Sequence, residues 1–391
     1  MRILLTFAGG RGHLEPLIAL AHAAEAARHT VAFVGRPWMR PQVEAAGFAA
    51  FVAGSDVGLT PERLPLADAD LEQDMRDVGR GFARRVASGR AADLSPLYTE
   101  WRPDVVVCEE FDFGAMVIAE RLGVPHATVL VSATGAFVRS EFVTGQLDVV
   151  RAEHGLSRDS DLAMPSRFLV LAPFPPSLRD PDLSSAPTTH HVRLSTLDVT
   201  QDETAPSWLT RKDDTPTVYV TLGTVYNMES GDLFQRVLAG LRDLAVEVVI
   251  TVGRDIDPRE LGAQPANVHI ERFMPQAVLL PHCDVVVSHA GSGSVLGALT
   301  HGLPMVLIPI GADQPLNASR CRALGVAEVL DAVGATPEMI GAAVSNVLAD
   351  GSARGVAVRI RHEIAAMPGP EHAVTLLDRL ASERAPIVQP E

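Results

Sequence analysis

The sequence is poor in positive charge, and lysine is almost absent. Of the 33 basic residues only Lys212 is a lysine, against 48 acidic residues, so the formal net charge is −15 at pH 7. Proteins that bind nucleic acid or anionic membranes use a basic face. We therefore expect neither nucleic acid nor a membrane surface as a partner.

Cysteines and long apolar runs are also scarce. The three cysteines, Cys108, Cys283 and Cys321, are far apart and form no CxxC pair. This excludes a zinc knuckle and a disulfide framework, and we expect buried thiols in a reducing cytoplasm. The apolar runs are short and interrupted by charges, glycine or proline, so neither a transmembrane helix nor a signal peptide is expected.

The sequence does contain a repeated alternation of short apolar strands with helices. Strands are predicted in the first half at 2–7, 31–34, 104–108 and 127–131, with helices at 14–28 and 113–122. In the second half, strands are predicted at 217–222, 246–252, 284–288 and 304–309, with helices at 232–244, 292–301 and 317–323. Continuous apolar strands between helices indicate parallel sheets that are covered on both faces.

This pattern predicts an α/β protein of two facing doubly wound domains with an interdomain cleft. We place the two domains at 1–200 and 201–373. A helix is predicted at 371–384, and the tail, 374–391, is expected to pack back on the first domain. The stretch 180–215 is rich in Pro, Ser, Thr and Asp, which is typical of an exposed linker.

Two insertions in the first domain, 56–92 and 134–164, follow predicted strands. Ligands of open α/β sheets bind beyond the carboxyl ends of the strands, so both insertions are candidates for lining a substrate pocket. Surface excursions without function are the alternative. Five aromatic residues in or near these segments are candidates for pocket walls or for core: Phe51, Phe82, Phe111, Phe113 and Phe137.

A glycine-rich turn at 8–13 joins the first strand to the first helix. It lacks the GxGxxG spacing, and the second strand ends in Gly35-Arg36 rather than in an acid, which argues against an NAD site. The turn places His13 at a helix N-terminus, which favours a neutral imidazole that accepts a proton from a bound hydroxyl. A capping or packing histidine is the alternative.

Three carboxylates, Glu109, Glu110 and Asp112, follow the strand at 104–108. That strand should neighbour the first one in a doubly wound sheet, so its end should lie near His13. A carboxylate bonded to one imidazole nitrogen fixes the tautomer and stabilises the imidazolium. Each acid has a helix-capping alternative, which suits Asp112 best.

The second motif, His289-Ala-Gly-Ser-Gly-Ser294, lies between a strand and a helix. Its small residues let backbone N–H groups approach an anion at the helix N-terminus, and the side chains add donors. The signature GxxxxGK[ST] is absent, so this is not a nucleotide-hydrolase loop. A diphosphate is the ligand that it fits. Gly223-Thr224 forms a second small-residue turn at the end of the strand at 217–222.

The run 273–314 resembles the donor-binding signature of inverting nucleotide-sugar glycosyltransferases of family 1, which have two Rossmann-like domains (the GT-B fold). It is most similar to the antibiotic and macrolide glycosyltransferases of actinomycetes. The resemblance implies transfer of a sugar from a dTDP- or UDP-linked donor, deoxysugars included, to a small hydrophobic natural-product aglycone. It also implies that 1–200 binds the acceptor and 201–373 binds the donor, with inversion, no metal and no cofactor besides the donor co-substrate. A monomer or a homodimer is expected.

The resemblance assigns a role to each matching residue. In catalysis, His13 corresponds to the general base and Glu109 to the carboxylate that orients it, where the family usually has Asp; Asp112 is the fallback. On the donor, Phe273 stacks on the base, while the backbone of Met274 and the side chain of Gln276 bind base and ribose. The diphosphate is bound by His289, Gly291, Ser292, Gly293 and Ser294, and Gly223 and Thr224 form a second turn on its phosphate side. Asp313 and Gln314 bind sugar hydroxyls, and Arg254 is a further donor contact.

Other functions remain open at this point. A nucleotide-sugar epimerase shares the scaffold, but the two insertions favour a transferase with an acceptor pocket. A membrane-associated cell-wall transferase is disfavoured by the charge of −15. A non-catalytic helper protein is disfavoured by the presence of His13 and His289. A metal-dependent transferase would use an Asp-x-Asp triplet; triplets begin at Asp68, Asp159, Asp180 and Asp255, all in loop-like stretches.

Overall fold

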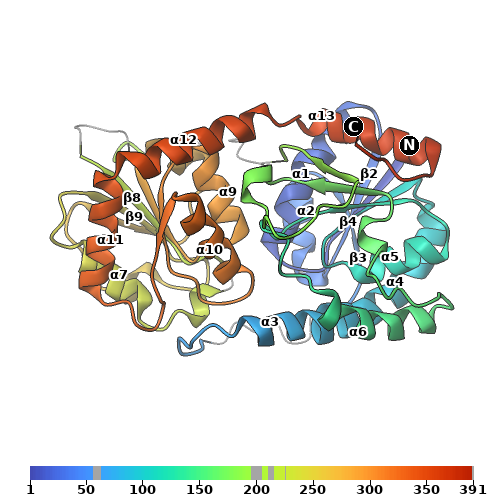
Figure 1. Cartoon of the computed structure of the whole chain (residues 1–391), viewed down its shortest axis with the longest axis horizontal. Helices are drawn as coiled ribbons and strands as arrows, with labels where there is room; N and C mark the ends of the chain where they lie inside the picture. Colours follow the sequence, from blue (N-terminus) through green and yellow to red (C-terminus); the bar gives the residue numbers. More distant parts are fainter. Residues whose placement is uncertain (56–62, 195–204, 210–214, 225, 390–391) are drawn as a thin grey trace. The chain divides into compact units, whose positions relative to one another are not determined.

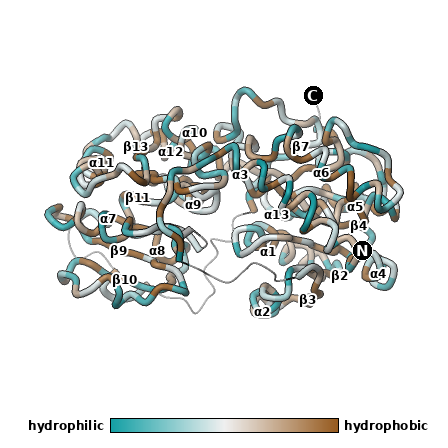
Figure 2. Tube along the Cα trace, turned by 90° about the horizontal axis from the view of Figure 1, so that it is seen from below, coloured by the Kyte–Doolittle hydropathy of each residue, from teal (hydrophilic) through white to brown (hydrophobic). Residues whose placement is uncertain are grey.

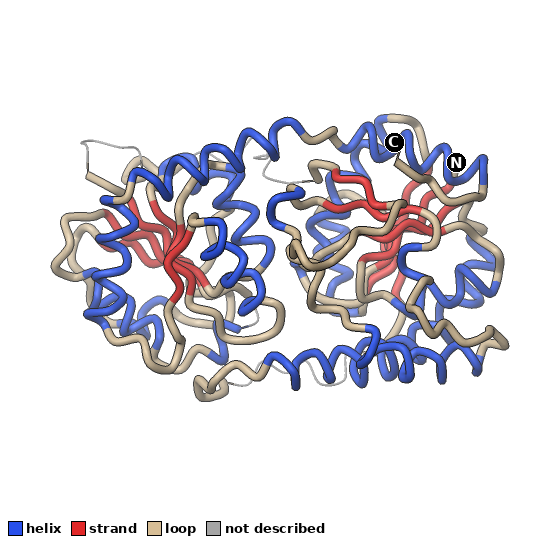
Figure 3. The backbone as a smooth tube through the Cα atoms, in the orientation of Figure 1, coloured by secondary structure: helices blue, strands red, loops and turns tan. Residues whose placement is uncertain are grey.

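The computed structural model describes residues 1–55, 63–194, 205–209, 215–224 and 226–389. The chain divides into two compact units (Figure 1). Unit 1 contains Met1–Leu59, Glu72–Thr196 and Met367–Glu391, and unit 2 contains Thr60–Leu71 and Leu197–Ala366. In Figure 3 each unit has a central sheet with helices on both faces.

The sheet of unit 1 is parallel, with strand order β3-β2-β1-β4-β5-β6-β7. Its strands are β1 (Arg2–Thr6), β2 (Thr30–Gly35), β3 (Ala49–Val52), β4 (Val105–Glu109), β5 (His126–Val129), β6 (Leu169–Ala172) and β7 (Thr189–His191). The chain order reverses between β1 and β4, which pair directly. The segments that follow these two strands therefore meet at the carboxyl edge, where doubly wound sheets bind ligands.

Helices cover this sheet. They are α1 (Arg11–Ala26), η1 (Pro37–Met39), α2 (Arg40–Ala45), α3 (Leu71–Asp77), η2 (Val78–Val86), α4 (Ala87–Trp101), α5 (Phe113–Arg121), α6 (Ser140–Glu153), η3 (Met164–Ser166), η4 (Pro176–Leu178) and α13 (Pro370–Glu383). The first predicted insertion is thus helical from Leu71 onward. Its middle part, η2, is a π-helix, a form found mostly near functional sites.

The last helix, α13, is an integral part of unit 1. It packs on α1, and its apolar face, which includes Leu376, Leu377 and Leu380, is at most 3% exposed. Beyond it, the N–H of Ile387 donates to the Phe168 carbonyl at 2.7 Å. The final helix therefore completes the core formed by β1, β4 and α1.

The predicted linker at 180–215 is wrong in its first part, because β7 (Thr189–His191) is an edge strand of the unit 1 sheet. Thr189 and His190 are 6% and 7% exposed. A strand of Thr and His carries no apolar signal, so the polar composition concealed it. Residues 195–204 and 210–214 of this stretch lie outside the described residues.

The sheet of unit 2 is also parallel, with order β10-β9-β8-β11-β12-β13 and a reversal between β8 and β11. Its strands are β8 (Thr217–Thr221), β9 (Glu247–Thr251), β10 (Val268–Glu271), β11 (Val285–Ser288), β12 (Met305–Leu307) and β13 (Ala327–Val329). Its helices are η5 (Tyr226–Glu229), α7 (Leu233–Leu241), η6 (Pro258–Leu261), α8 (Gln276–Leu279), η7 (Leu280–His282), α9 (Ser292–Thr300), α10 (Gln314–Leu324), α11 (Pro337–Ala349) and α12 (Gly351–Ala366).

The prediction of two doubly wound α/β domains is confirmed. Figure 2 shows β4 and β9 as hydrophobic segments, in agreement with their burial inside each unit. Within the described part of the chain, no helix is long and apolar enough to cross a membrane.

Candidate active site

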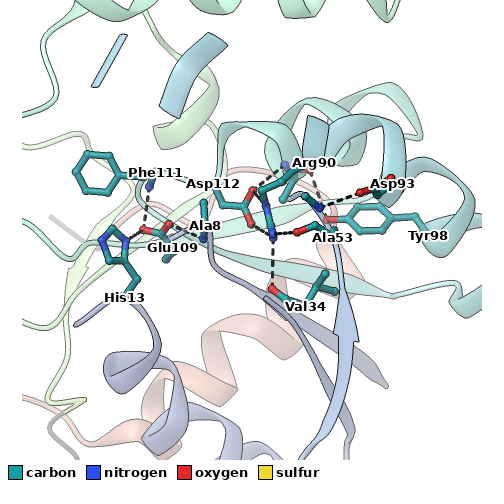
Figure 4. A network of polar contacts seen from close by, with 12 residues as sticks. Ala8, His13, Val34, Ala53, Arg90, Asp93, Tyr98, Glu109, Phe111 and Asp112 are labelled. Atoms are coloured by element: carbon teal, nitrogen blue, oxygen red, sulfur yellow. Dashed lines mark hydrogen bonds and ion pairs between the residues drawn. The ribbon is translucent and has the colours of Figure 1, made fainter. Parts of the chain in front are cut away.

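His13 lies on the first turn of α1 and pairs with Glu109 at the end of β4 (Figure 4). The His13 Nδ1 atom is 2.9 Å from Glu109 Oε2. That oxygen also accepts the N–H of Phe111 at 3.0 Å, and Oε1 accepts the N–H of Ala8 at 3.0 Å. The fully buried carboxylate is therefore fixed from three sides. A proton on Nδ1 leaves the lone pair on Nε2, which is the tautomer that a general base needs.

Two phenylalanines border the imidazole of His13. The Phe82 ring, on the π-helix η2, stacks at a centroid distance of 6.0 Å and an angle of 19°. The Phe111 ring packs edge-on at 5.4 Å. Of the other aromatic candidates, Phe137 contacts Phe111 at 6.3 Å, whereas Phe51 packs on Trp101. Phe113 is a core residue, 1% exposed.

Asp112 does not orient His13, so this fallback assignment is corrected. Both of its oxygens bind the buried Arg90 guanidinium, at 2.8 Å from Nε and 2.5 Å from Nη2 (Figure 4). Asp112 also caps α5 by accepting the N–H of Ala115. Burial lowers the pKa of Arg90, but the attraction of Asp112 outweighs it and the pKa is raised. Asp112 is a structural counter-ion and helix cap.

The turn after β11 in unit 2 is built around His289. This side chain is buried, and a Cβ at Gly223 or Gly291 would lie 2.6 or 2.5 Å from its Nε2 atom. Gly223 also has a φ of +80°, so glycine is required there on two grounds. His289 Nδ1 is buried and has no hydrogen-bond partner among the described residues, and burial lowers the pKa of this imidazole to about 4. The neutral ring therefore has a polar atom available for a ligand.

The small residues after His289 open α9, as expected. Gly291 is the N-cap, and Ser292 is the first helical residue and is buried. Gly293 is exposed and Ser294 is half-buried on the same first turn, while Thr224 is exposed beside Gly223. The first turn of an α-helix presents backbone N–H groups that have no intrahelical acceptor, and such a turn is a common site for phosphate groups.

Asp313 and Gln314 are brought next to this turn by α10. Ser292 Oγ donates to Asp313 Oδ2 at 2.6 Å. Gln314 Oε1 accepts the N–H groups of Ile310 and Gly311 at 2.8 and 3.2 Å, so its amide nitrogen remains as the donor.

Asn317 was missed by the sequence reasoning. It is fully buried, and its Nδ2 donates to Asp313 Oδ2 at 2.9 Å, Ser292 Oγ at 3.1 Å and the Ala290 carbonyl at 3.0 Å. The spacing of four residues after Asp313, which places both on one helix face, was the available signal. Ala290 and Ala312 have φ of +68° and +53°, a strain that clusters at functional sites.

The candidate base-binding residues are partly brought together. The Phe273 ring is 41% exposed, and the Arg254 guanidinium lies 5.4 Å from its centroid. Met274 is buried. The Gln276 side chain points toward α9, where its Oε1 would be 2.6 Å from a Cβ at Gly297. Phe273 and Arg254 therefore offer an open aromatic and cationic surface, while Gln276 is turned toward the interior of unit 2.

The Asp-x-Asp triplets serve local structure where their contacts are known. Asp159 accepts the N–H groups of Ala163 and Met164, and Asp257, from the triplet at 255, pairs with Arg259 at 2.6 Å. Among the residues that the structure describes, no group of three or more His, Cys, Asp or Glu side chains is arranged to hold a metal ion.

Comparison with known proteins identifies the class. The family described as "Erythromycin biosynthesis protein CIII-like" matches the chain with its N-terminal domain at residues 81–223 and its C-terminal domain at 235–380. The protein is a glycosyltransferase of the two-domain GT-B fold. More narrowly, it belongs to the erythromycin CIII-like family of actinomycete natural-product glycosyltransferases.

Individual relatives are similar over almost their whole length. The chain is 27% identical to the 3-alpha-mycarosylerythronolide B desosaminyl transferase of Saccharopolyspora erythraea, covering 98% of this chain and 99% of that one. It is 26% identical to the TDP-daunosamine transferase DnrS of Streptomyces peucetius, covering 100% and 99%. The structure of the Streptomyces sp. SF2575 glycosyltransferase SsfS6, complexed with thymidine diphosphate, is 26% identical with a TM-score of 0.78, covering 97% and 99%. The family prediction is thereby confirmed, and the epimerase and helper alternatives are not favoured.

Proposed function

We propose that this glycosyltransferase moves a sugar from a dTDP-linked donor to a hydroxyl of a small hydrophobic aglycone, with inversion and with His13 as the base. The observation that carries the proposal is the contact of 2.9 Å between His13 Nδ1 and the buried Glu109 carboxylate. The choice of dTDP rests on the relative named as a TDP-sugar transferase and on the related structure complexed with thymidine diphosphate.

In unit 1, His13 Nε2 takes the proton of the acceptor hydroxyl. The Glu109 carboxylate stabilises the imidazolium that forms, because it accepts a hydrogen bond from the proton that stays on His13 Nδ1. The acceptor oxygen then forms its bond to the anomeric carbon as the bond from that carbon to the diphosphate oxygen breaks. Attack from the face opposite the leaving group inverts the anomeric configuration.

In unit 2, negative charge builds on the departing diphosphate. The N–H groups of the first turn of α9 and the His289 Nδ1 atom would bind that charge without reorganising, which is how enzymes stabilise such transition states. Phe273 and Arg254 would receive the base, and Asp313 and Gln314 would bind the sugar hydroxyls. Ser292 and Asn317 hold the Asp313 carboxylate in one orientation.

Two measurements test this proposal. Calorimetry with dTDP, UDP and GDP should show tightest binding of dTDP, and His289→Ala should weaken it. Transfer from a dTDP-sugar to a panel of phenolic acceptors, followed by NMR of the product, should give the inverted anomer. His13→Ala should bind dTDP as the wild type does and transfer no sugar. Wild-type turnover in His13→Ala, or a product of retained configuration, would overturn the mechanism.

A further inference from the structure

We propose that Arg179 in unit 1 anchors an anionic oxygen of the acceptor, so that the preferred aglycones are apolar ring systems that carry a carboxylate or comparable anionic oxygen. The inference rests on the proposed function, because it concerns the acceptor of the same reaction. It is carried by an arginine with two buried donor atoms, Nε and Nη1, that have no hydrogen-bond partner within the described ranges of the chain.

Arg179 lies at the carboxyl edge of the unit 1 sheet. It directly follows η4, in the segment after β6, and the N–H of the next residue, Asp180, donates to the Thr134 carbonyl at 3.0 Å. A Cβ at Gly135, in the segment after β5, would lie 2.0 Å from Arg179 Nη1 and 2.3 Å from its Cζ. The guanidinium therefore packs directly on the Gly135 backbone, which has a φ of +70°.

The Nε and Nη1 atoms of Arg179 are buried, and neither has a hydrogen-bond partner among the described residues. Burial lowers the pKa of this guanidinium despite the nearby carboxylates of Glu110 and Asp180. Glu110 attracts this guanidinium but forms no hydrogen bond with its Nε or Nη1 atom, and Glu110 Oε2 instead accepts the N–H groups of Val131 and Ser132 at 2.9 and 2.8 Å. Unsatisfied buried donors are costly, so an arginine kept in this state points to a ligand.

Arg90 in the same unit shows what a structural arginine looks like. It is fully buried, and its donors are bound by Asp112 and by the carbonyls of Ala53 and Val34. In the part of the chain that the structure describes, Arg179 Nε and Nη1 are bound neither by a carboxylate nor by a carbonyl. The contrast distinguishes Arg90, whose hydrogen bonds stabilise the fold, from Arg179, whose buried donors can bind a ligand.

The position of Arg179 also fits an acceptor that reaches His13. His13 follows β1, Arg179 follows β6, and β4 and β5 lie between these strands. Three strand spacings amount to roughly 14 Å, which is the scale of a polycyclic skeleton. Phe111 contacts His13 at 5.4 Å and Phe137 at 6.3 Å, and Phe137 is two residues from Gly135. These two rings connect the surroundings of His13 with the segment on which the Arg179 guanidinium packs.

The test uses two fluorescent phenols that differ only in a carboxylate: 7-hydroxycoumarin and 7-hydroxycoumarin-3-carboxylate. The wild type should bind the carboxylate about tenfold more tightly, as expected for a charge-assisted hydrogen bond. Arg179→Met should abolish that preference. Arg179→Lys, which keeps the charge and loses the planar fork, should retain part of it. Calorimetry with dTDP should give the same affinity in all three proteins.

A second measurement excludes a structural role. Without a ligand, Arg179→Met should unfold thermally close to the wild-type temperature, because the buried Nε and Nη1 donors that it removes have no hydrogen-bond partner among the described residues and only the weaker attraction to Glu110 and Asp180 is lost. The matched control Arg90→Met should unfold several degrees lower, because it leaves Asp112 unpaired. Equal binding of the two coumarins by the wild type, binding of neither, a preference that survives in Arg179→Met, or a loss of thermal stability like that of Arg90→Met would each overturn the inference. Failure of the proposed function would instead appear as lost dTDP binding or as an active His13→Ala enzyme.

Discussion

Gly9 and the His13 ring are in direct contact, because a Cβ built on Gly9 would lie 2.2 Å from His13 Cδ2 and 2.3 Å from Nε2. The glycine thus sets the position of the base as much as Glu109 does. No side chain at Gly9 is compatible with this ring position.

Gly9→Ala should therefore displace the base without disturbing the nucleotide site. We expect kcat to fall roughly 100-fold, the usual cost of misplacing a catalytic group by about 1 Å. The dTDP affinity should not change. Gly12→Ala is the matched control, because a Cβ at Gly12 meets nothing within 4 Å. Steady-state kinetics and calorimetry on both variants check the prediction, which fails if they behave alike.

Glu109→Gln should be more damaging than Glu109→Asp. The glutamine keeps the shape of the side chain, but its amide group would face the N–H donors of Ala8 and Phe111. Because the amide is neutral, it also cannot stabilise an imidazolium. We expect a loss of roughly 10³ in kcat at unchanged dTDP affinity. The aspartate keeps the charge and should retain more activity. A glutamine variant with wild-type kcat would show that Glu109 does not act on the base.

Acid should destabilise unit 2 through His289. The folded-state pKa of about 4 lies below the ordinary 6.5, so the unfolded chain binds a proton first as pH falls. The stability is fully present above pH 6.5 and is lost as pH falls toward 4, by about 1 kcal/mol between pH 7 and 5.5. His289→Gln should lack this loss. Urea unfolding at the two pH values, followed on the transition that dTDP shifts, measures the difference; equal slopes with pH would contradict it.

Asn317→Ala should act on the sugar and not on the nucleotide. The substitution removes Asn317 Nδ2, which donates to both Asp313 Oδ2 and Ser292 Oγ. The Asp313 carboxylate therefore loses its fixed orientation. We expect the KM for the dTDP-sugar to rise about tenfold, the equivalent of one hydrogen bond to a charged group. The affinity for dTDP alone should stay the same. Asn346→Ala, at an exposed position of α11, is the control. An equal loss of dTDP affinity would mean that the substitution damages the whole turn.

The sequence was sufficient to predict the elements whose buried residues form continuous apolar runs. β1, β4, β8 and β11 are such runs, and the structure has them within one or two residues of the predicted bounds. The edge strand β7 was lost, because its Thr and His residues are buried by neighbours far along the chain rather than by their own hydrophobicity.

The candidate site divides in the same way. Residues recognised by type at a fixed place in a motif, such as His13 and His289, could be named from the sequence. The sequence placed Glu109 first and Asp112 as the fallback. The fallback could not be rejected from the sequence, because its rejection depends on Arg90, which lies on α4 and binds both oxygens of Asp112. Asn317 and Arg179 were invisible for a related reason: one is defined by partners from another turn, and the other by the lack of partners for its buried donors among the described residues.

The membership of α13 in unit 1 has a consequence for how the chain is made. Ribosomes deliver residues in order, so all of unit 2, which ends at Ala366, is synthesised before α13. Unit 1 begins first, yet its core lacks Ala373, Leu377 and Ile387 until these residues, which follow unit 2 in the sequence, emerge. Domains generally fold as units during synthesis, so the half that is translated first is the half that finishes folding last.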